Sequence, residues 1–293
     1  MPAPRSVDEY FLDPRLIRRA FDAAAATFDS AAVVHAEIRT RLLERLDVVR
    51  LDPSLIVDLG AGTGHGSRAL QDRYPRSQVL AIDLSTRMLV EARRQQRWLR
   101  RFRRTAADAA RLPLRDAGVD MVFSNLMLQW CNDPDAIFRE TRRVLRPGAL
   151  LTFASLGPDS LRELRRAWAA TDAHVHVHRF IDMHDLGDAL MRAGFAEPVM
   201  DTERLTITYP TVDALHRELQ DSGSANHATG RPRGLSGRAA RERFAQNIEA
   251  ARVDGVFPVT LEVVYGHAWA GTSHKARDRG EFRVGVEAIG RRS

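Results

Sequence analysis

The sequence predicts an α/β fold built around a mostly parallel β-sheet. Short apolar runs alternate with segments of helical periodicity, which is typical of consecutive strand–helix–strand units. The first of these runs ends in a glycine-rich turn, as strands do where the backbone passes close to a ligand. The 293 residues, 44% of them hydrophobic and 28% charged, suffice for one large core carrying an insertion.

The first half of the chain carries the alternating pattern. Residues 15–48 have apolar side chains at helical spacing, interrupted by small residues at 23–27, so we expect two helices before the first strand. A third strand is indicated at 103–105. The other expected strands are 56–59, 79–83, 119–124 and 149–154, and the expected helices between them are 67–74, one beginning at Ser85, and 134–145.

The pattern changes after Pro158. Helices are expected at 161–170 and 183–194, strands at 205–209 and 261–270, and a glycine-rich loop at 222–237. The polar, basic tail from 272 onward is expected to be loosely ordered. The predicted organisation is therefore an N-terminal helical lid (1–50), a ligand-binding core (51–155), substrate-side helices with the remaining strands (156–271), and the tail (272–293).

Charge and cysteine content narrow the function classes. The chain has 44 basic residues, all of them arginine except Lys275, and 38 acidic residues. The resulting net charge of +6 fits a nucleic acid, an acidic protein or an acidic small molecule as partner. The single cysteine, Cys131, excludes an internal disulfide framework and favours a reducing compartment. No apolar run of about 18 residues and no secretory signal at 1–13 are present, so we expect a soluble, cytoplasmic protein.

Glycines and acidic residues mark the expected ligand site. Asp58 precedes the turn Gly60-Ala61-Gly62-Thr63-Gly64, and it is placed to bind a cationic or amine-bearing group. His65 stands where the dinucleotide fingerprint has its third glycine. Asp83 ends the next strand, 23 residues after Gly60, where a carboxylate accepts hydrogen bonds from ribose hydroxyls. Asp108, after the third strand, is placed to receive an adenine amino group.

Four motifs in this order resemble those of class I S-adenosylmethionine-dependent methyltransferases. They are Asp58 to Gly64, Asp83-Leu84-Ser85-x-x-Met88-Leu89, Asp108-Ala109 and Leu145-Arg146-Pro147-Gly148-Ala149. The resemblance covers about residues 50–155 and implies a Rossmann-like, mostly parallel seven-stranded sheet with helices on both faces. It also implies that S-adenosylmethionine is the cofactor, with Asp58 near its amino group, Asp83 on the ribose and Met88 on the adenine. The implied cofactor-binding residues are Asp58, Gly60, Ala61, Gly62, Gly64, Asp83, Leu84, Met88, Asp108, Ala109, Asn125 and Gln129.

A second resemblance concerns the acceptor. Residues 124–131, Ser-Asn-Leu-Met-Leu-Gln-Trp-Cys, are similar to the malonyl-acyl carrier protein O-methyltransferases of biotin synthesis. Three further stretches fit that family, although Phe28 stands where the family usually has tyrosine. They are Phe21-Asp22-x-Ala24-Ala25-x-x-Phe28, His176-x-x-Arg179-Phe180, and Gly223-x-x-Asn226 through Gly230-Arg231.

That resemblance implies methylation of the free carboxylate of malonyl-acyl carrier protein by a monomeric enzyme, with no nucleic-acid or membrane partner. A carboxylate is ionised at neutral pH, so no general base is expected, but a cation is needed to orient it. Arg231 and Arg179 match family positions. Arg231 is favoured because its glycine-rich loop can close over the substrate, and Tyr209 is expected to add a hydrogen bond.

Several alternatives remain. The arginine-hydroxylating assembly factor of respiratory complex I is similar at Asp185-Leu186-Gly187 and Tyr209-Pro210, although Gln129-Trp130-Cys131 favours the methyltransferase. A non-catalytic S-adenosylmethionine- or RNA-binding module is the alternative of another class, and the intact motif residues weigh against it. The basic run at 93–104 fits RNA, an acidic carrier protein or a solvated helix face. Alternating His174, His176 and His178 fit a metal site by spacing, but no other ligands accompany them, so no metal is expected.

Overall fold

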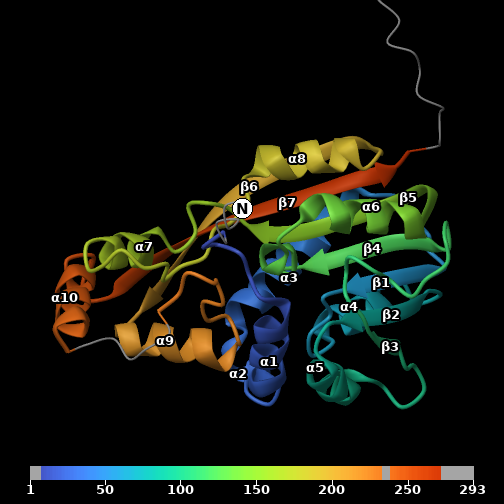
Figure 1. Ribbon diagram of the computed structural model, residues 1–293. Coiled ribbons are helices and arrows are strands. Elements are labelled where there is room, and N and C mark those ends of the chain that lie inside the picture. Colours follow the sequence, from blue (N-terminus) through green and yellow to red (C-terminus); the bar gives the residue numbers. More distant parts are fainter. Residues whose placement is uncertain (1–7, 233–237, 272–293) are drawn as a thin grey trace, which may run out of the picture.

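The computed structural model describes residues 8–232 and 238–271, which form one seven-stranded sheet (Figure 1). The strand order is β3-β2-β1-β4-β5-β7-β6. Neighbouring strands are parallel, except that β7 is antiparallel to both β5 and β6. This confirms the predicted α/β class with a mostly parallel sheet. The strands are β1 (Leu55–Leu59), β2 (Gln78–Asp83), β3 (Arg103–Ala106), β4 (Val119–Asn125), β5 (Leu145–Leu156), β6 (Phe195–Tyr209) and β7 (Phe257–Ala270).

Several helices begin at a side chain that caps their first turn. Asp13 accepts a hydrogen bond from the Arg15 amide before α1, and Ser85 and Asp133 cap α5 and α6 in the same way. Among the described residues no helix has the length and apolarity needed to cross a membrane. The α-helices are α1 (Pro14–Ala24), α2 (Phe28–Ala31), α3 (Val33–Glu44), α4 (His65–Arg73), α5 (Thr86–Glu91), α6 (Pro134–Val144), α7 (Arg162–Ala169), α8 (Met183–Arg192), α9 (Val212–Asp221) and α10 (Arg238–Glu249).

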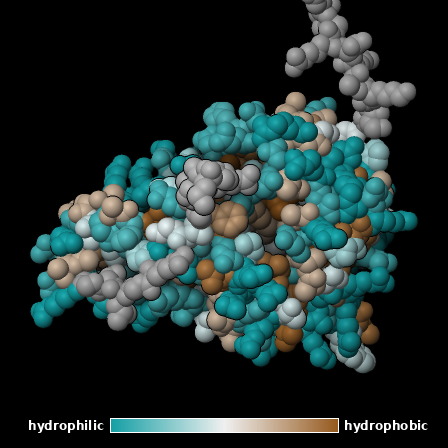
Figure 2. Space-filling view, in the orientation of Figure 1, coloured by the Kyte–Doolittle hydropathy of each residue, from teal (hydrophilic) through white to brown (hydrophobic). Residues whose placement is uncertain are grey.

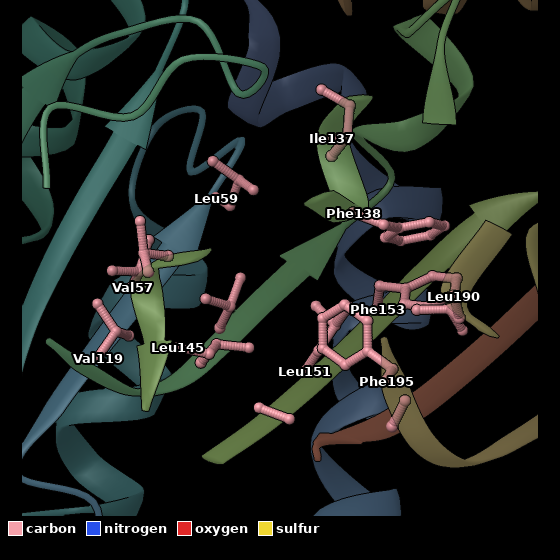
Figure 3. Close-up of a cluster of buried hydrophobic side chains, with 14 of the residues drawn as sticks. Val57, Leu59, Val119, Ile137, Phe138, Leu145, Leu151, Phe153, Leu190 and Phe195 are labelled. Carbon is pink, nitrogen blue, oxygen red and sulfur yellow. The ribbon is translucent and has the colours of Figure 1, made fainter. Parts of the chain in front are cut away.

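The helices cover both faces of the sheet. On one face α6 and α8 pack over the strands, and Phe138, Phe153 and Phe195 meet at the centre of that core (Figure 3). On the other face α3, α4 and α5 bury Ile38 and Leu70 against β1, β2 and β4. The central strands therefore have apolar side chains on both faces, which is why they appear in the sequence as continuous apolar runs.

The N-terminal helices and the chain after Pro158 differ from the prediction in detail. The 15–48 region forms three α-helices instead of two, because the chain breaks at Ala32 as well as at Thr27. β6 has 15 residues and begins ten residues earlier than expected, and α9 and α10 were not predicted. Residues 174–180 form no strand, so the three histidines do not share a strand face. The expected loose tail and part of the glycine-rich loop lie outside the described residues.

Two further structural features frame the site. At the far end of β6 and β7, helices α7, α9 and α10 enclose a separate cluster around Phe244 (Figure 1). Near the middle, three distant segments join through backbone hydrogen bonds: Gly230 donates to Glu9, Thr229 donates to Phe11, and Val175 donates to Gly230. We call residues 8–12, 172–180 and 222–231 the cap. Asn132 fixes the cap to the core by both donating to and accepting from the Leu12 backbone at 2.8 Å.

Candidate active site

A cavity of about 300 Å³ lies at the carboxyl ends of β1, β2 and β4. In doubly wound sheets this edge is where ligands bind, because the connections after the strands diverge there. Helices α1, α2 and α3 form the opposite wall. Figure 2 shows that this side of the molecule is largely hydrophilic, with hydrophobic atoms gathered around its middle.

The glycine turn is shaped by close approach of other backbone and side chains. Gly60 and Gly62 have φ of +78° and +53°, which disfavour any side chain. A Cβ at Gly60 would also lie 2.5 Å from the Met127 Cβ. The turn therefore leaves its backbone open to the cavity, which both glycines line together with Ala61.

Asp58 is a buried carboxylate at the base of this turn. Its Oδ2 accepts a hydrogen bond from the Ser67 hydroxyl at 2.7 Å, and a Cβ at Gly66 would come within 2.9 Å of the same oxygen. Burial raises the Asp58 pKa to about 6, and the nearby Asp83 charge adds to this effect. The Arg39 charge opposes this rise but forms no hydrogen bond or ion pair with Asp58 within the described residues, so the buried carboxylate still favours a positively charged ligand group beside it.

Asp83 is fixed at the end of β2 by backbone donors. Its two carboxylate oxygens accept from the amides of Gly62 and Ser85, each at 2.8 Å. A carboxylate offers about four lone-pair positions, so it can still accept two hydroxyl groups from a ligand. Burial raises its pKa, while these amide hydrogen bonds oppose the rise.

The remaining walls are contributed by three more segments. Leu84 and Met88 line one side, and Asp108 and Ala109 follow β3. Asn125, at the end of β4, donates from its side-chain nitrogen to the His35 carbonyl, while its Oδ1 is buried without a partner among the described residues. That unpartnered acceptor indicates a ligand donor at this point.

Ten of the twelve cofactor-binding residues expected from the sequence line the cavity; within the described chain, Gly64 and Gln129 do not. Gly64 serves packing instead, since a Cβ there would lie 2.9 Å from both Ala92 and Phe102. Gln129 lies in a 3₁₀ turn and is 6% exposed. The ten lining residues are Asp58, Gly60, Ala61, Gly62, Asp83, Leu84, Met88, Asp108, Ala109 and Asn125.

Sequence reasoning missed the wall formed by α2 and α3. Phe28 of α2 and His35 and Arg39 of α3 line the cavity, and the Phe28 and His35 rings meet edge to face at 5.1 Å. Burial lowers the His35 pKa to about 4, so its imidazole is neutral. The signal in the sequence was the spacing of four between His35 and Arg39, which places both on one helix face.

Trp130 lines this cavity and contacts His178, which lines a second cavity of about 510 Å³ under the cap. The Trp130 ring packs against Phe21 of α1 at 5.3 Å, His178 at 5.0 Å and His227 at 6.1 Å. His178 lines the second cavity, and its Nε2 is buried with no partner in the described ranges. Burial lowers the His178 pKa to about 4.

The three acceptor candidates occupy different places. Arg231 is half-buried in the cap and lines neither cavity. Its guanidinium donates to the Ala228 carbonyl, and its charge lowers the pKa of the His227 imidazole, although burial lowers it more. Arg179 is exposed, lines the second cavity and lies over the Tyr10 ring at 4.8 Å. Tyr209 lies in the α7–α9–α10 cluster beside Glu218, outside both cavities.

The histidines of the cap have packing roles. His176 stacks on Trp168 with ring centroids 3.6 Å apart and bonds Asp172 at 2.9 Å. His178 packs on Trp130, so the two rings serve different neighbours. No group of three potential metal ligands occurs in the part of the chain that the structure describes.

Known proteins with similar sequences fit this geometry. A family model described as methyltransferase domain matches residues 57–153. The malonyl-[acyl-carrier protein] O-methyltransferase of Methylovorus sp. is 48% identical over 270 residues, which cover 90% of this chain and 91% of that protein. The enzyme of the same name from Laribacter hongkongensis is 46% identical over 96% of this chain and 97% of its own length.

Solved structures share the fold at low identity. The YcgJ protein of Bacillus subtilis has a TM-score of 0.58 at 14% identity, covering 79% of this chain and 98% of its own. Phosphoethanolamine N-methyltransferase 2 of Haemonchus contortus, in complex with S-adenosyl-L-methionine, has a TM-score of 0.54 at 16% identity. That match covers 92% of this chain and 62% of the Haemonchus protein. These structures share the fold alone, whereas the identity and coverage of the sequence relatives show that the chain belongs to the malonyl-[acyl-carrier protein] O-methyltransferase family.

Proposed function

We propose that this protein transfers the methyl group of S-adenosylmethionine to the free carboxylate of malonyl-acyl carrier protein, for the early steps of biotin synthesis. The observation that carries this proposal is the cavity with Asp58, Asp83 and Asp108 in a chain 48% identical to such an enzyme. Its monomeric state and cytoplasmic location stay predictions.

The residues present fit this cofactor. Asp58 meets the requirement for an anion beside the cofactor's amino group, and Asn125 Oδ1 offers a buried acceptor that lacks a donor among the described residues. Asp83 retains lone pairs for the ribose hydroxyls, and Leu84 and Met88 provide an apolar surface for the adenine. When bound, the cofactor supplies a methyl group made electrophilic by its positively charged sulfur.

The protein's own task in this reaction is orientation and exclusion of water. The acceptor carboxylate is already ionised, so no side chain has to remove a proton. Phe21 and Trp130 form an apolar wall between cofactor cavity and cap, which keeps water from the reacting atoms. Holding the carboxylate in line with the methyl group then accounts for much of the rate increase.

We assign the acceptor carboxylate to Arg231 ahead of Arg179. Arg231 is half-buried, and its guanidinium makes one side-chain hydrogen bond within the described ranges, so further N–H groups remain for a carboxylate. It also approaches His227, which contacts Trp130 at the edge of the cofactor cavity. Arg179 is exposed to solvent, where a charge pair is weaker. Tyr209, in its separate cluster, has the weakest support.

The basic run supports an acidic carrier protein as partner. Arg93, Arg101 and Arg103 are exposed and form no side-chain hydrogen bond or ion pair with any described residue. They follow α5, whose first turn contributes Met88 to the cavity wall. Arg101 and Arg103 precede and begin β3, at the edge of the sheet opposite the cavity, so they would act through the long-range field of the protein, which raises the rate at which an acidic partner associates.

A methyl-transfer assay tests the proposed function. Labelled S-adenosylmethionine and malonyl-acyl carrier protein should give a labelled ester that an esterase removes. Absence of label after long incubation with enzyme that still binds the cofactor would refute the assignment.

Arg231→Ala should raise KM for malonyl-acyl carrier protein by roughly 10- to 100-fold, as expected for loss of a charged hydrogen bond, with unchanged affinity for S-adenosylhomocysteine. Tyr209→Phe is the control that should leave both constants unchanged.

A further inference from the structure

Arg39 is a cation in the wall of the cofactor cavity that the proposed reaction leaves unused. It lies on α3, one helical turn after His35, and both side chains line the cavity. Its guanidinium forms no hydrogen bond or ion pair within 8–232 and 238–271. A half-buried guanidinium without a partner costs stability, so its presence calls for a ligand anion.

We propose that Arg39 binds the carboxylate of the amino-acid part of S-adenosylmethionine. This inference rests on the cofactor assigned above and adds a second charged contact to the amino-acid end of the ligand. The assigned pair is then complementary: Asp58 faces the ammonium group and Arg39 faces the carboxylate.

The geometry of the cavity supports this orientation. Asp83 and Met88 lie on β2 and α5 and fix the nucleoside end, so the amino-acid end points toward the glycine turn and Asp58. Arg39 lies at that end, since it lines the same cavity and its charge interacts with those of Asp58 and Asp29. Asp29 in turn accepts a hydrogen bond from the Thr63 hydroxyl of the glycine turn at 2.5 Å.

The neighbours of Arg39 leave its charge available. Asp58 is bonded to Ser67, and Asp29 is bonded to Thr63 and lies 3.2 Å from His65, so neither carboxylate is paired with Arg39. Burial lowers the Arg39 pKa, whereas Asp58 and Asp29 oppose that shift, and the guanidinium stays charged. His35 beside it is neutral, with its pKa lowered to about 4, and adds no competing charge.

The acceptor carboxylate is the other anion that enters the enzyme, but it belongs elsewhere. The acceptor carboxylate is assigned above to Arg231 of the cap, whose aromatic contacts with the cofactor cavity are those of His178 and His227 with Trp130. Arg39 is on α3, near the glycine turn, and forms no hydrogen bond or ion pair with the cap segments within the described chain, whereas Arg231 is part of the cap itself. The two arginines therefore serve two different carboxylates.

Equilibrium binding of two cofactors that differ in one carboxylate tests the assignment. Arg39→Gln should lower the affinity for S-adenosylmethionine, measured by calorimetry, by roughly 10- to 100-fold, because a charge-assisted hydrogen bond is lost. Decarboxylated S-adenosylmethionine keeps the sulfonium and the ammonium groups, so its affinity should stay the same or increase when the nearby cation is removed. No acceptor is present, so the outcome does not depend on the identity of the methylated substrate.

Two results would overturn the proposal. Equal weakening of both cofactors would show that Arg39 only supports the fold, and unchanged cofactor binding with a raised KM for malonyl-acyl carrier protein would place it on the acceptor. Arg50→Ala, at an exposed position outside the cavity, removes the same charge and should leave both affinities unchanged. The ligand-free stability of Arg39→Gln should equal or exceed that of the parent, which shows that the variant folds.

Discussion

At the scale of single residues, Asp58 couples cofactor binding to pH. Its carboxyl is buried and its pKa is raised to about 6 from 3.8, with desolvation as the largest cause. The ligand-free folded protein therefore holds the Asp58 proton more tightly than the unfolded chain does. The cofactor's ammonium group favours the ionised form, so binding and ligand-free folding make opposite demands on the same side chain.

We predict that the affinity for S-adenosylhomocysteine is nearly constant above pH 7 and falls by up to about tenfold per unit as pH drops below about 6, because Asp58 must lose a proton to bind. Asp58→Asn should bind more weakly and show a flatter curve. Calorimetric titrations between pH 5 and pH 8 measure both. An unchanged pH profile in Asp58→Asn would assign the dependence to another group.

The same shift predicts an effect on stability. A carboxyl whose folded pKa exceeds its unfolded value stabilises the fold below the unfolded pKa and loses that contribution as pH rises through the folded pKa. Ligand-free Asp58→Asn should therefore be more stable than the parent at pH 7.5, by about 2 to 3 kcal/mol if the whole shift is relieved, and no more stable at pH 4. Urea unfolding at the two pH values checks this, and equal differences at both would contradict it.

At the scale of elements, α1 is fastened over the cavity by one side chain. Asp22 accepts from the Ser85 hydroxyl at 2.6 Å and from the Arg87 amide at 3.3 Å, at the first turn of α5. α1 also contributes Ile17 and Phe21 to the cavity wall. This contact therefore closes the wall that covers the cofactor.

We predict that Asp22→Ala loosens α1 and speeds cofactor release by roughly tenfold, as expected for loss of hydrogen bonds to a carboxylate. Hydrogen exchange should rise in 14–24 while β1 and β4 stay protected, and stopped-flow displacement of S-adenosylhomocysteine measures the release rate. Asp13→Ala, which removes the cap of α1 without touching α5, is the comparison. Equal release rates in Asp22→Ala and the parent would mean that α1 is held by its apolar contacts alone.

At the scale of the whole molecule, local signals determined what the sequence could predict. The sequence predicted β1, β2 and β4 because buried parallel strands are continuous apolar runs. It predicted the turn after β1 because the positive φ there requires glycines, which are visible in the sequence. β6 was underestimated, since it is an edge strand whose first half carries Glu197 and Asp201 at exposed positions. The α3 wall of the site was missed because tertiary packing, and not periodicity, decides which helix face meets the cavity. Gln129 was assigned from its motif, but it lies buried in a 3₁₀ turn and does not line the cavity.

β6 and β7 connect the sheet core to the far cluster of helices. The two strands pair from Phe195 with Ala270 to Tyr209 with Phe257, so they run from the sheet core into the α7–α9–α10 cluster. Leu156 and Ile207 pack against the clusters on both sides. An independent lobe would need a boundary that few contacts cross, and these strands cross it along their full length.

We therefore predict that Phe244→Ala in the far cluster and Phe138→Ala in the sheet core each lower the free energy of unfolding by about 3 to 5 kcal/mol while keeping a single thermal transition. Saturating S-adenosylhomocysteine, at about 100 times its Kd, should raise stability by about 2.7 kcal/mol in both variants, because the cavity is untouched and unfolding anywhere releases the ligand. Calorimetry with and without ligand measures these shifts. A separate early transition in Phe244→Ala, insensitive to the ligand, would show instead that the far cluster unfolds while the cofactor site remains intact, and that the long strands transmit no cooperativity between them.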